Sequence, residues 1–139
     1  MKEYQKILVT VDGSPQSQKA FEEACHIAER NHAELYLLTV LDLTGFRGTA
    51  SESPVKLTEE LQKIAERNVA ELKASTDYPV EVKVAAGNPK HEIVQIAEDL
   101  GIDMIVIGET GLNRLERRVL GSTTVYVVNH AKCNVMVVK

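Results

Sequence analysis

The sequence contains no long apolar run and no excess of basic residues. No stretch approaches the roughly 20 apolar residues that a membrane span needs, and the first residues, Met1 to Lys6, lack the apolar core of a signal peptide. Lys and Arg total 16 against 20 Asp and Glu, for a formal net charge of -4, whereas a general nucleic-acid binder normally has a basic excess. The sequence therefore predicts a cytoplasmic protein that binds neither membrane nor nucleic acid. The charge does not exclude a phosphorylated small molecule, which needs only local positive potential.

Cysteine is also scarce, and the histidines form no pattern. Cys25 and Cys133 are far apart in apolar surroundings, which favours two small buried thiols in a reducing compartment over a disulfide. The four histidines lack the spacing of metal ligands. We therefore expect no disulfide and no metal site built from protein side chains.

At 139 residues the chain has the length of one domain, residues 1–139. Short apolar runs alternate along it with amphipathic helical patterns. The runs are Ile7–Val11, Leu35–Val40, Val80–Val84, Met104–Ile107 and Val135–Val138. Four of them are nearly continuously apolar, as in parallel strands that are covered on both faces, whereas Val80–Val84 alternates apolar and polar residues and predicts an edge strand.

The helical patterns predict helices at Ser14–Arg30, about Leu57–Lys73, Pro89–Leu100 and Ser122 to about His130. In the second helix, the expected buried face consists of Leu57, Leu61, Ile64, Ala65, Asn68 and Leu72. Ser14 followed by Pro15 is typical of a helix start, and Gly101 of a helix end. The order of elements implies an α/β fold, a single doubly wound domain with a mainly parallel sheet and helices on both faces.

One long segment, Thr44–Pro54, breaks this regular alternation. It is rich in Gly, Ser and Thr and has no hydrophobic period, so it predicts a mobile loop. It leaves the carboxyl end of the second strand, the side on which open α/β sheets bind ligands. The segment is either a lid over such a site or a plain connection.

The segment after the fourth run has the spacing Gly-x-x-Gly-x9-Gly-Ser, from Gly108 to Ser122. Gly108 follows the strand directly, and Gly111 permits a second tight turn. Gly121 precedes the three hydroxyl residues that open the last helix, Ser122, Thr123 and Thr124. A helix start presents unpaired N–H groups and the positive end of the helix dipole, which together make a natural anion site. Each glycine alone could be a turn residue, but the combination predicts the phosphate-binding end of an adenine-nucleotide site.

Asp12 ends the first strand, in the sequence Val11-Asp12-Gly13-Ser14. At the carboxyl edge of the sheet, its carboxylate could accept hydrogen bonds from a ligand or help hold a hydrated magnesium ion. It could equally form an Asx-type turn that leads into the helix capped by Ser14. The two interpretations are compatible, and the sequence leaves both open.

Other nucleotide-binding folds lack support in the sequence. There is no Gly-x-Gly-x-x-Gly after the first strand and no Gly-x4-Gly-Lys-Ser/Thr anywhere. The third strand ends Ala85-Ala86-Gly87, where a response-regulator receiver would have an Asp. Three segments instead resemble the universal stress protein family, and the resemblance covers the whole chain. They are Lys6–Ser14, the run from Gly108 to Ser122, and Tyr126–Val138.

The resemblance implies a five-stranded parallel sheet of order 3-2-1-4-5 and a member of the branch of the family that binds ATP, with Mg2+ held through the phosphates. It also implies a regulatory role in stress response. The residues that correspond to the family's nucleotide contacts are Thr10, Val11, Asp12, Val40, Gly108, Thr110, Gly111, Gly121, Ser122, Thr123 and Thr124. Among them, Val40 would offer backbone groups to adenine. The family commonly forms homodimers through its last strand, here Val135–Val138, which fits the need of a bare aliphatic edge for a partner.

The sequence departs from the family pattern between the first two motif glycines. Glu109 and Thr110 stand there in place of a small and a basic residue, so a positive side chain is lost beside the phosphates. Arg114, Arg117 and Arg118 follow nearby, but their helical spacing is more typical of a solvated face. Backbone N–H groups are unaffected by these changes, so nucleotide binding is still expected. No convincing nucleophile or general base accompanies the motif, so we expect no catalytic residue; a slow ATP hydrolase and a nucleotide-independent dimeric interaction module with a vestigial site are the alternatives.

Overall fold

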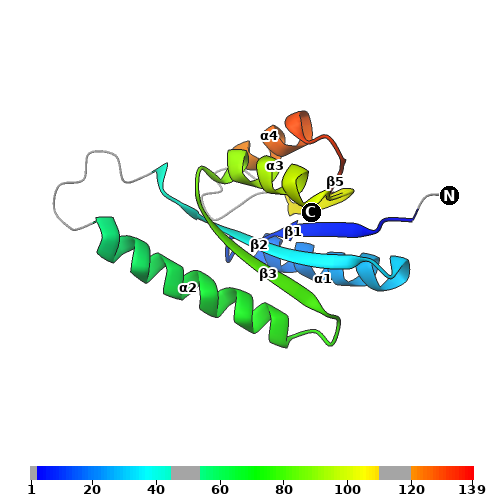
Figure 1. Ribbon diagram of the computed structural model, residues 1–139, viewed down its shortest axis with the longest axis horizontal. Helices are drawn as coiled ribbons and strands as arrows, with labels where there is room; N and C mark the ends of the chain where they lie inside the picture. The colour runs from blue at the N-terminus through cyan, green and yellow to red at the C-terminus, as the bar shows by residue number, and fades with distance from the viewer. Residues whose placement is uncertain (1–2, 45–53, 110–119) are drawn as a thin grey trace.

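The structure, a computed structural model, describes residues 3–44, 54–109 and 120–139. Its elements are β1 (Lys6–Thr10), α1 (Pro15–Asn31), β2 (Glu34–Asp42), α2 (Pro54–Ala74), β3 (Val80–Gly87), α3 (Pro89–Leu100), β4 (Met104–Gly108), α4 (Ser122–His130) and β5 (Asn134–Val138). Within these residues, five strands form one sheet in the order β3-β2-β1-β4-β5, and every pairing is parallel (Figure 1). The expected fold class and strand order are therefore confirmed.

Helices cover both faces of this sheet, and each face has its own apolar core (Figure 1). On one face, Phe21 of α1 and Val69 of α2 are buried together with alternate residues of β1 and β2. On the other face, Ile93 of α3 and Val127 of α4 are buried with the intervening strand residues. The central strands are thus apolar on both sides, which explains why their sequences are continuously hydrophobic.

The sheet order places β1 and β4 side by side at the centre, with β3 and β5 at the edges. The chain leaves β1 into α1 on one face and leaves β4 toward α4 on the other face. Connections that diverge in this way leave a crevice at the carboxyl ends of the two strands, which is where doubly wound folds bind ligands. In β3, Val84 is 38% exposed, which agrees with the predicted edge strand.

Two helix ends agree with the sequence prediction. The Ser14 side chain accepts a hydrogen bond from the Ser17 amide at 3.1 Å, and Pro15 is the first residue of α1. At the end of α3, Gly101 adopts a left-handed conformation with a φ of 69°, which a glycine reaches without steric strain. The first of these ends matters most for the site, because it fixes the beginning of α1 at the carboxyl edge of the sheet.

The buried face of α2 differs in part from the prediction. Ala65 is buried as expected, but Ile64 is 46% exposed, and Val69, which the pattern left out, is only 4% exposed. The helix packs on β2 and β3, so the residues above those strands are buried, whereas Ile64 borders an open cleft. The helix begins at Pro54, the last residue of the expected loop, whose residues 45–53 lie outside the described residues.

Cys25 and Cys133 are free and half-buried. Burial raises the pKa of both thiols above the ordinary value, so both side chains are neutral near pH 7. They behave as small packing residues rather than as reactive thiolates. In the described parts of the chain, no helix combines the length and the apolarity that crossing a membrane would require.

Candidate functional site

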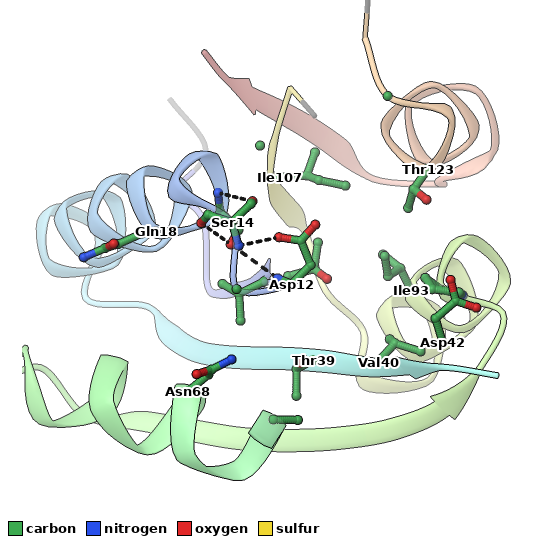
Figure 2. A pocket seen from close by; sticks show the side chains of 18 of the residues that line it. Asp12, Ser14, Gln18, Thr39, Val40, Asp42, Asn68, Ile93, Ile107 and Thr123 are labelled. Carbon is green, nitrogen blue, oxygen red and sulfur yellow. Dashed lines mark hydrogen bonds between the residues drawn. The ribbon is translucent and has the colours of Figure 1, made fainter. Parts of the chain in front are cut away.

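A cleft of about 960 Å³ lies at the carboxyl edge of the sheet. Figure 2 shows it between the beginning of α1, the end of β2, and the helices α2, α3 and α4. All of the predicted site residues that the structure describes line this one cleft. They are Thr10, Val11, Asp12, Val40, Gly108, Gly121, Ser122, Thr123 and Thr124. The two remaining predicted residues, Thr110 and Gly111, lie outside the described residues.

The beginning of α4 is open toward the cleft. Its N-cap residue is Gly121, which has no side chain to cap the helix. The Gly121 carbonyl accepts the Val125 amide at 3.0 Å, so the helical hydrogen bonds begin at that amide. Among the described residues, no hydrogen bond reaches the amides of Ser122, Thr123 and Thr124. These three N–H groups and the positive end of the helix dipole are therefore available to an anion.

Thr124 joins α4 to β4. Its hydroxyl donates a buried hydrogen bond of 2.8 Å to the Gly108 carbonyl, and the residue is only 3% exposed. The hydroxyl hydrogen is thus occupied, and Thr124 offers a ligand its backbone amide instead. Ser122 is exposed and Thr123 half-buried, so their hydroxyl groups remain accessible; Figure 2 shows the Thr123 side chain directed into the cleft.

Gly108 also lies in close contact with α1. A Cβ at this position would be 3.1 Å from the backbone carbonyl of Gln16 in the first turn of that helix. The absence of a side chain lets α1 and β4 approach each other at the carboxyl edge. The first glycine of the predicted motif therefore has a packing role in addition to its position in the cleft.

Asp12 forms the Asx-type turn that the sequence allowed. Its Oδ1 accepts the Ser14 amide at 2.9 Å, and its own amide donates to the Ser17 hydroxyl at 3.3 Å (Figure 2). Gly13 between them has a φ of 87°, which explains the glycine at this point. Asp12 is nevertheless exposed in the cleft, and its Oδ2 has no hydrogen-bond partner among the described residues. The turn and a ligand-binding role are thus geometrically compatible.

The backbone of Val40 faces the cleft. In a strand, successive residues direct their amide and carbonyl groups to opposite sides. The Leu38 carbonyl points toward β1, because it accepts the Val11 amide at 2.9 Å. Val40, two residues later, directs its N–H and C=O to the same side, where β1 has already ended. Its side chain packs on the other apolar core, near Ile93 (Figure 2).

The described lining of the cleft carries negative charge. Its charged side chains are Asp12, Asp42 and Glu71, and no Lys, Arg or His is found among the described lining residues. The arginines that the sequence places in the motif, at 114, 117 and 118, lie outside the described residues. An anionic ligand would therefore be held in this part by amides and hydroxyls, and its excess charge would favour an accompanying cation.

Residues of the turn before α1 and of the helices α1, α2 and α3 complete the cleft, and the sequence pattern did not assign them to the site. They include Gly13, Ser14, Gln18, Asn68, Glu71 and Ile93. Most of them carry no signal, because their place in the cleft depends on how the helices pack. Asn68 is the exception, since a carboxamide on the otherwise apolar face of a helix is unusual.

The comparison with known families agrees with this geometry. The model of the universal stress protein family matches residues 3–139, which is nearly the whole chain. The chain belongs to the universal stress protein family. A universal stress protein of Methanocaldococcus jannaschii is 36% identical over 140 residues, a match that covers 98% of this chain and 82% of the relative.

Solved structures of other universal stress proteins share the fold. The protein UspA from Lactobacillus plantarum is 39% identical, with a TM-score of 0.80 over 100% of both chains. A second universal stress protein, solved in complex with cAMP, is 26% identical, with a TM-score of 0.73 over 99% of both chains. This relative is therefore similar over the full length of the chain and binds an adenine nucleotide.

Proposed function

We propose that this universal stress protein binds ATP, together with Mg2+, in the cleft at the carboxyl edge of the sheet and acts as a cytoplasmic regulatory module of the stress response. The observation that carries the proposal is the uncapped beginning of α4, where three backbone amides face the cleft beside the end of β4. A helix beginning of this kind favours phosphate oxygens. The relative that binds cAMP supports an adenine nucleotide as the ligand.

The two ends of the cleft differ, and each fits a different part of the nucleotide. The phosphates would lie against the amides of Ser122, Thr123 and Thr124, and by the family motif Thr110 and Gly111 would complete that side. The adenine would lie at the end of β2, where the backbone groups of Val40 are unpaired with β1. Between them, Thr10, Val11 and Asp12 would line the ligand along the end of β1.

Mg2+ would be held mainly by the phosphate oxygens, with Asp12 as the nearby carboxylate. A triphosphate brings several negative charges into a cleft whose described lining contains only carboxylates as charged groups. A magnesium ion bridging phosphate oxygens would reduce this repulsion, and oxygen atoms are its preferred ligands. We therefore propose that the protein binds the magnesium complex of ATP better than free ATP.

Calorimetric titration of the purified protein with ATP tests this function. With Mg2+ present, we expect saturable binding, and ATP at 100 times its dissociation constant should stabilise the fold by about 2.7 kcal/mol and raise the Tm by several degrees. Addition of EDTA should weaken ATP binding at least tenfold and change AMP binding much less. Neither heat nor a Tm shift at millimolar ATP would instead favour the nucleotide-independent interaction module, and steady ADP formation would favour the hydrolase.

We also propose a homodimer formed through the β5 edge. Within the described residues, β5 pairs with β4 alone, so the backbone groups of its outer side need a partner. Beside it, α4 presents Val125 and Val128, which are 41% and 46% exposed and lie one helical turn apart. A second copy that covers this edge would bury both valines.

Val128→Asp is expected to convert the dimer into a monomer, because burying a carboxylate at the interface costs free energy that burying a valine does not. Analytical ultracentrifugation or light scattering at micromolar concentration measures the change. Val84→Asp is the matched control, since Val84 is 38% exposed on β3 at the opposite edge. If both variants stay dimeric, or both become monomers, the interface does not lie at β5.

A further inference from the structure

Asn68 lies on the face of α2 that is directed toward the sheet. Its neighbours on this face, Ala65 and Val69, are 8% and 4% exposed, and Asn68 itself is half-buried and lines the cleft. Its carboxamide makes no hydrogen bond with any described residue. A half-buried carboxamide without a partner in the protein loses part of its hydration, so its polar atoms favour further hydrogen-bond partners. A ligand in the cleft would provide them.

The carboxamide lies beside the turn that ends β1. Its Nδ2 is 3.3 Å from the place that a Cβ on Gly13 would occupy, and Gly13 is directly next to Asp12. In Figure 2, Asn68 and Thr123 lie on opposite sides of Asp12, in agreement with the packing of α2 and α4 on opposite faces of the sheet. A nucleotide with its phosphates at the beginning of α4 would therefore extend past Asp12 and bring its base toward Asn68.

The chemistry of a carboxamide matches the edge of adenine. Asn presents an acceptor oxygen next to a donor NH2 group. Adenine presents its 6-amino donor next to the N1 acceptor, so the two can form a pair of hydrogen bonds, as a carboxamide also does with the amino group and N7 of adenine. We propose that Asn68 recognises the adenine edge of the bound nucleotide and contributes to base specificity. This inference rests on the proposed binding of ATP in the same cleft.

Two substitutions at position 68 test the inference by titration with Mg-ATP and Mg-GTP. Asn68→Leu keeps a side chain of similar size but loses both polar groups, so ATP affinity should fall at least tenfold, the discrimination expected of one bidentate pair. Asn68→Asp keeps only acceptors, which oppose the N1 acceptor of adenine but suit the N1–H and 2-amino donors on the corresponding edge of guanine. The ratio of ATP to GTP affinity should therefore fall at least tenfold in this variant.

The Tm of the unliganded variants separates recognition from a structural role. Because Asn68 makes no hydrogen bond within the described protein, Asn68→Leu should have a Tm equal to or above that of the native protein. Gln62→Leu is the control on the same helix. Gln62 is exposed, donates a side-chain hydrogen bond to Glu66 and does not line the cleft. The ATP affinity of this variant should therefore equal that of the native protein.

The outcomes distinguish this inference from the proposed function. If the native protein binds ATP and both variants at position 68 keep its affinity and base preference, Asn68 does not contact the base, while the proposed function stands. If Asn68→Leu loses affinity for ATP and GTP equally and also has a lower Tm, the role of Asn68 is structural and the inference is wrong. If the native protein binds no nucleotide, both the function and the inference fail.

Discussion

Gly121→Val is expected to abolish ATP binding and to leave the fold intact. Gly121 is the N-cap of α4, with a φ of -61° and a ψ of 152°, values that any residue adopts, so valine introduces no backbone strain. Its branched side chain would, however, stand next to the free amides of Ser122, Thr123 and Thr124 and occupy the space that a phosphate group needs. Calorimetric titration with Mg-ATP should show at least a hundredfold loss, because the ligand would lose the amides that hold its charge.

The controls for Gly121→Val compare amides with hydroxyl groups. Ser122→Ala removes one exposed hydroxyl but keeps every amide, so it should weaken ATP binding by about tenfold or less. Valine is a poorer N-cap than glycine, at a cost of about 1 kcal/mol, so circular dichroism and the Tm must show that the variant is folded. Unchanged ATP affinity in a folded Gly121→Val variant would contradict the placement of the phosphates.

Gly108→Val is expected to destabilise the protein by about 2 to 3 kcal/mol, as forced overpacking does. A Cβ at this position would be 3.1 Å from the backbone carbon and oxygen of Gln16, and these backbone atoms belong to the first turn of α1. They cannot rotate away as the end of a side chain can, so α1 would have to move from β4. Urea denaturation should show a lower midpoint at an unchanged slope.

Gly101→Ala is the matched control for this effect. At Gly101 a Cβ would meet nothing within 4 Å, but the φ is 69°, so alanine there has conformational strain without a clash. We expect a loss of about 1 kcal/mol. If Gly108→Val costs no more than Gly101→Ala, the contact between β4 and α1 is looser than the structure indicates. ATP affinity of the folded Gly108→Val variant should also fall, because Gly108 anchors Thr124 through its carbonyl.

Much of the site was predictable because it consists of strand ends and a helix beginning, whose positions follow from the local sequence. The apolar runs predicted parallel strands, and the family resemblance implied that β1 and β4 are neighbours, so the residues that follow these strands, Asp12 and Gly108, were expected at the carboxyl edge of the sheet. Gly121 before α4 and the hydroxyl residues that open this helix indicated an open helix beginning. For Asp12 the sequence allowed a turn or a ligand contact, and the structure shows the turn with the carboxylate still exposed to the cleft.

The contribution of α2 was not predictable in the same way. Helical spacing predicted that Ile64 would be buried, and the structure exposes it at the cleft while it buries Val69. Periodicity defines a face of a helix but not the angle at which that face meets the sheet. A rotation of the helix about its own axis buries a residue at one margin of the face and exposes a residue at the other margin. For the same reason, the position of Asn68 beside Gly13 could not be inferred from its place in the sequence.

The sequence by itself determined the parallel doubly wound sheet and the chain segments that form its carboxyl edge, because these depend on local periodicity and on glycines with local roles. The family followed from the resemblance of three segments of the chain. Only the tertiary structure decided which side chains meet across that edge. It directed the hydroxyl of Thr124 to Gly108 rather than to the cleft and placed Asn68 opposite α4. Contacts of this kind depend on the packing of segments distant in sequence, and no local pattern encodes them.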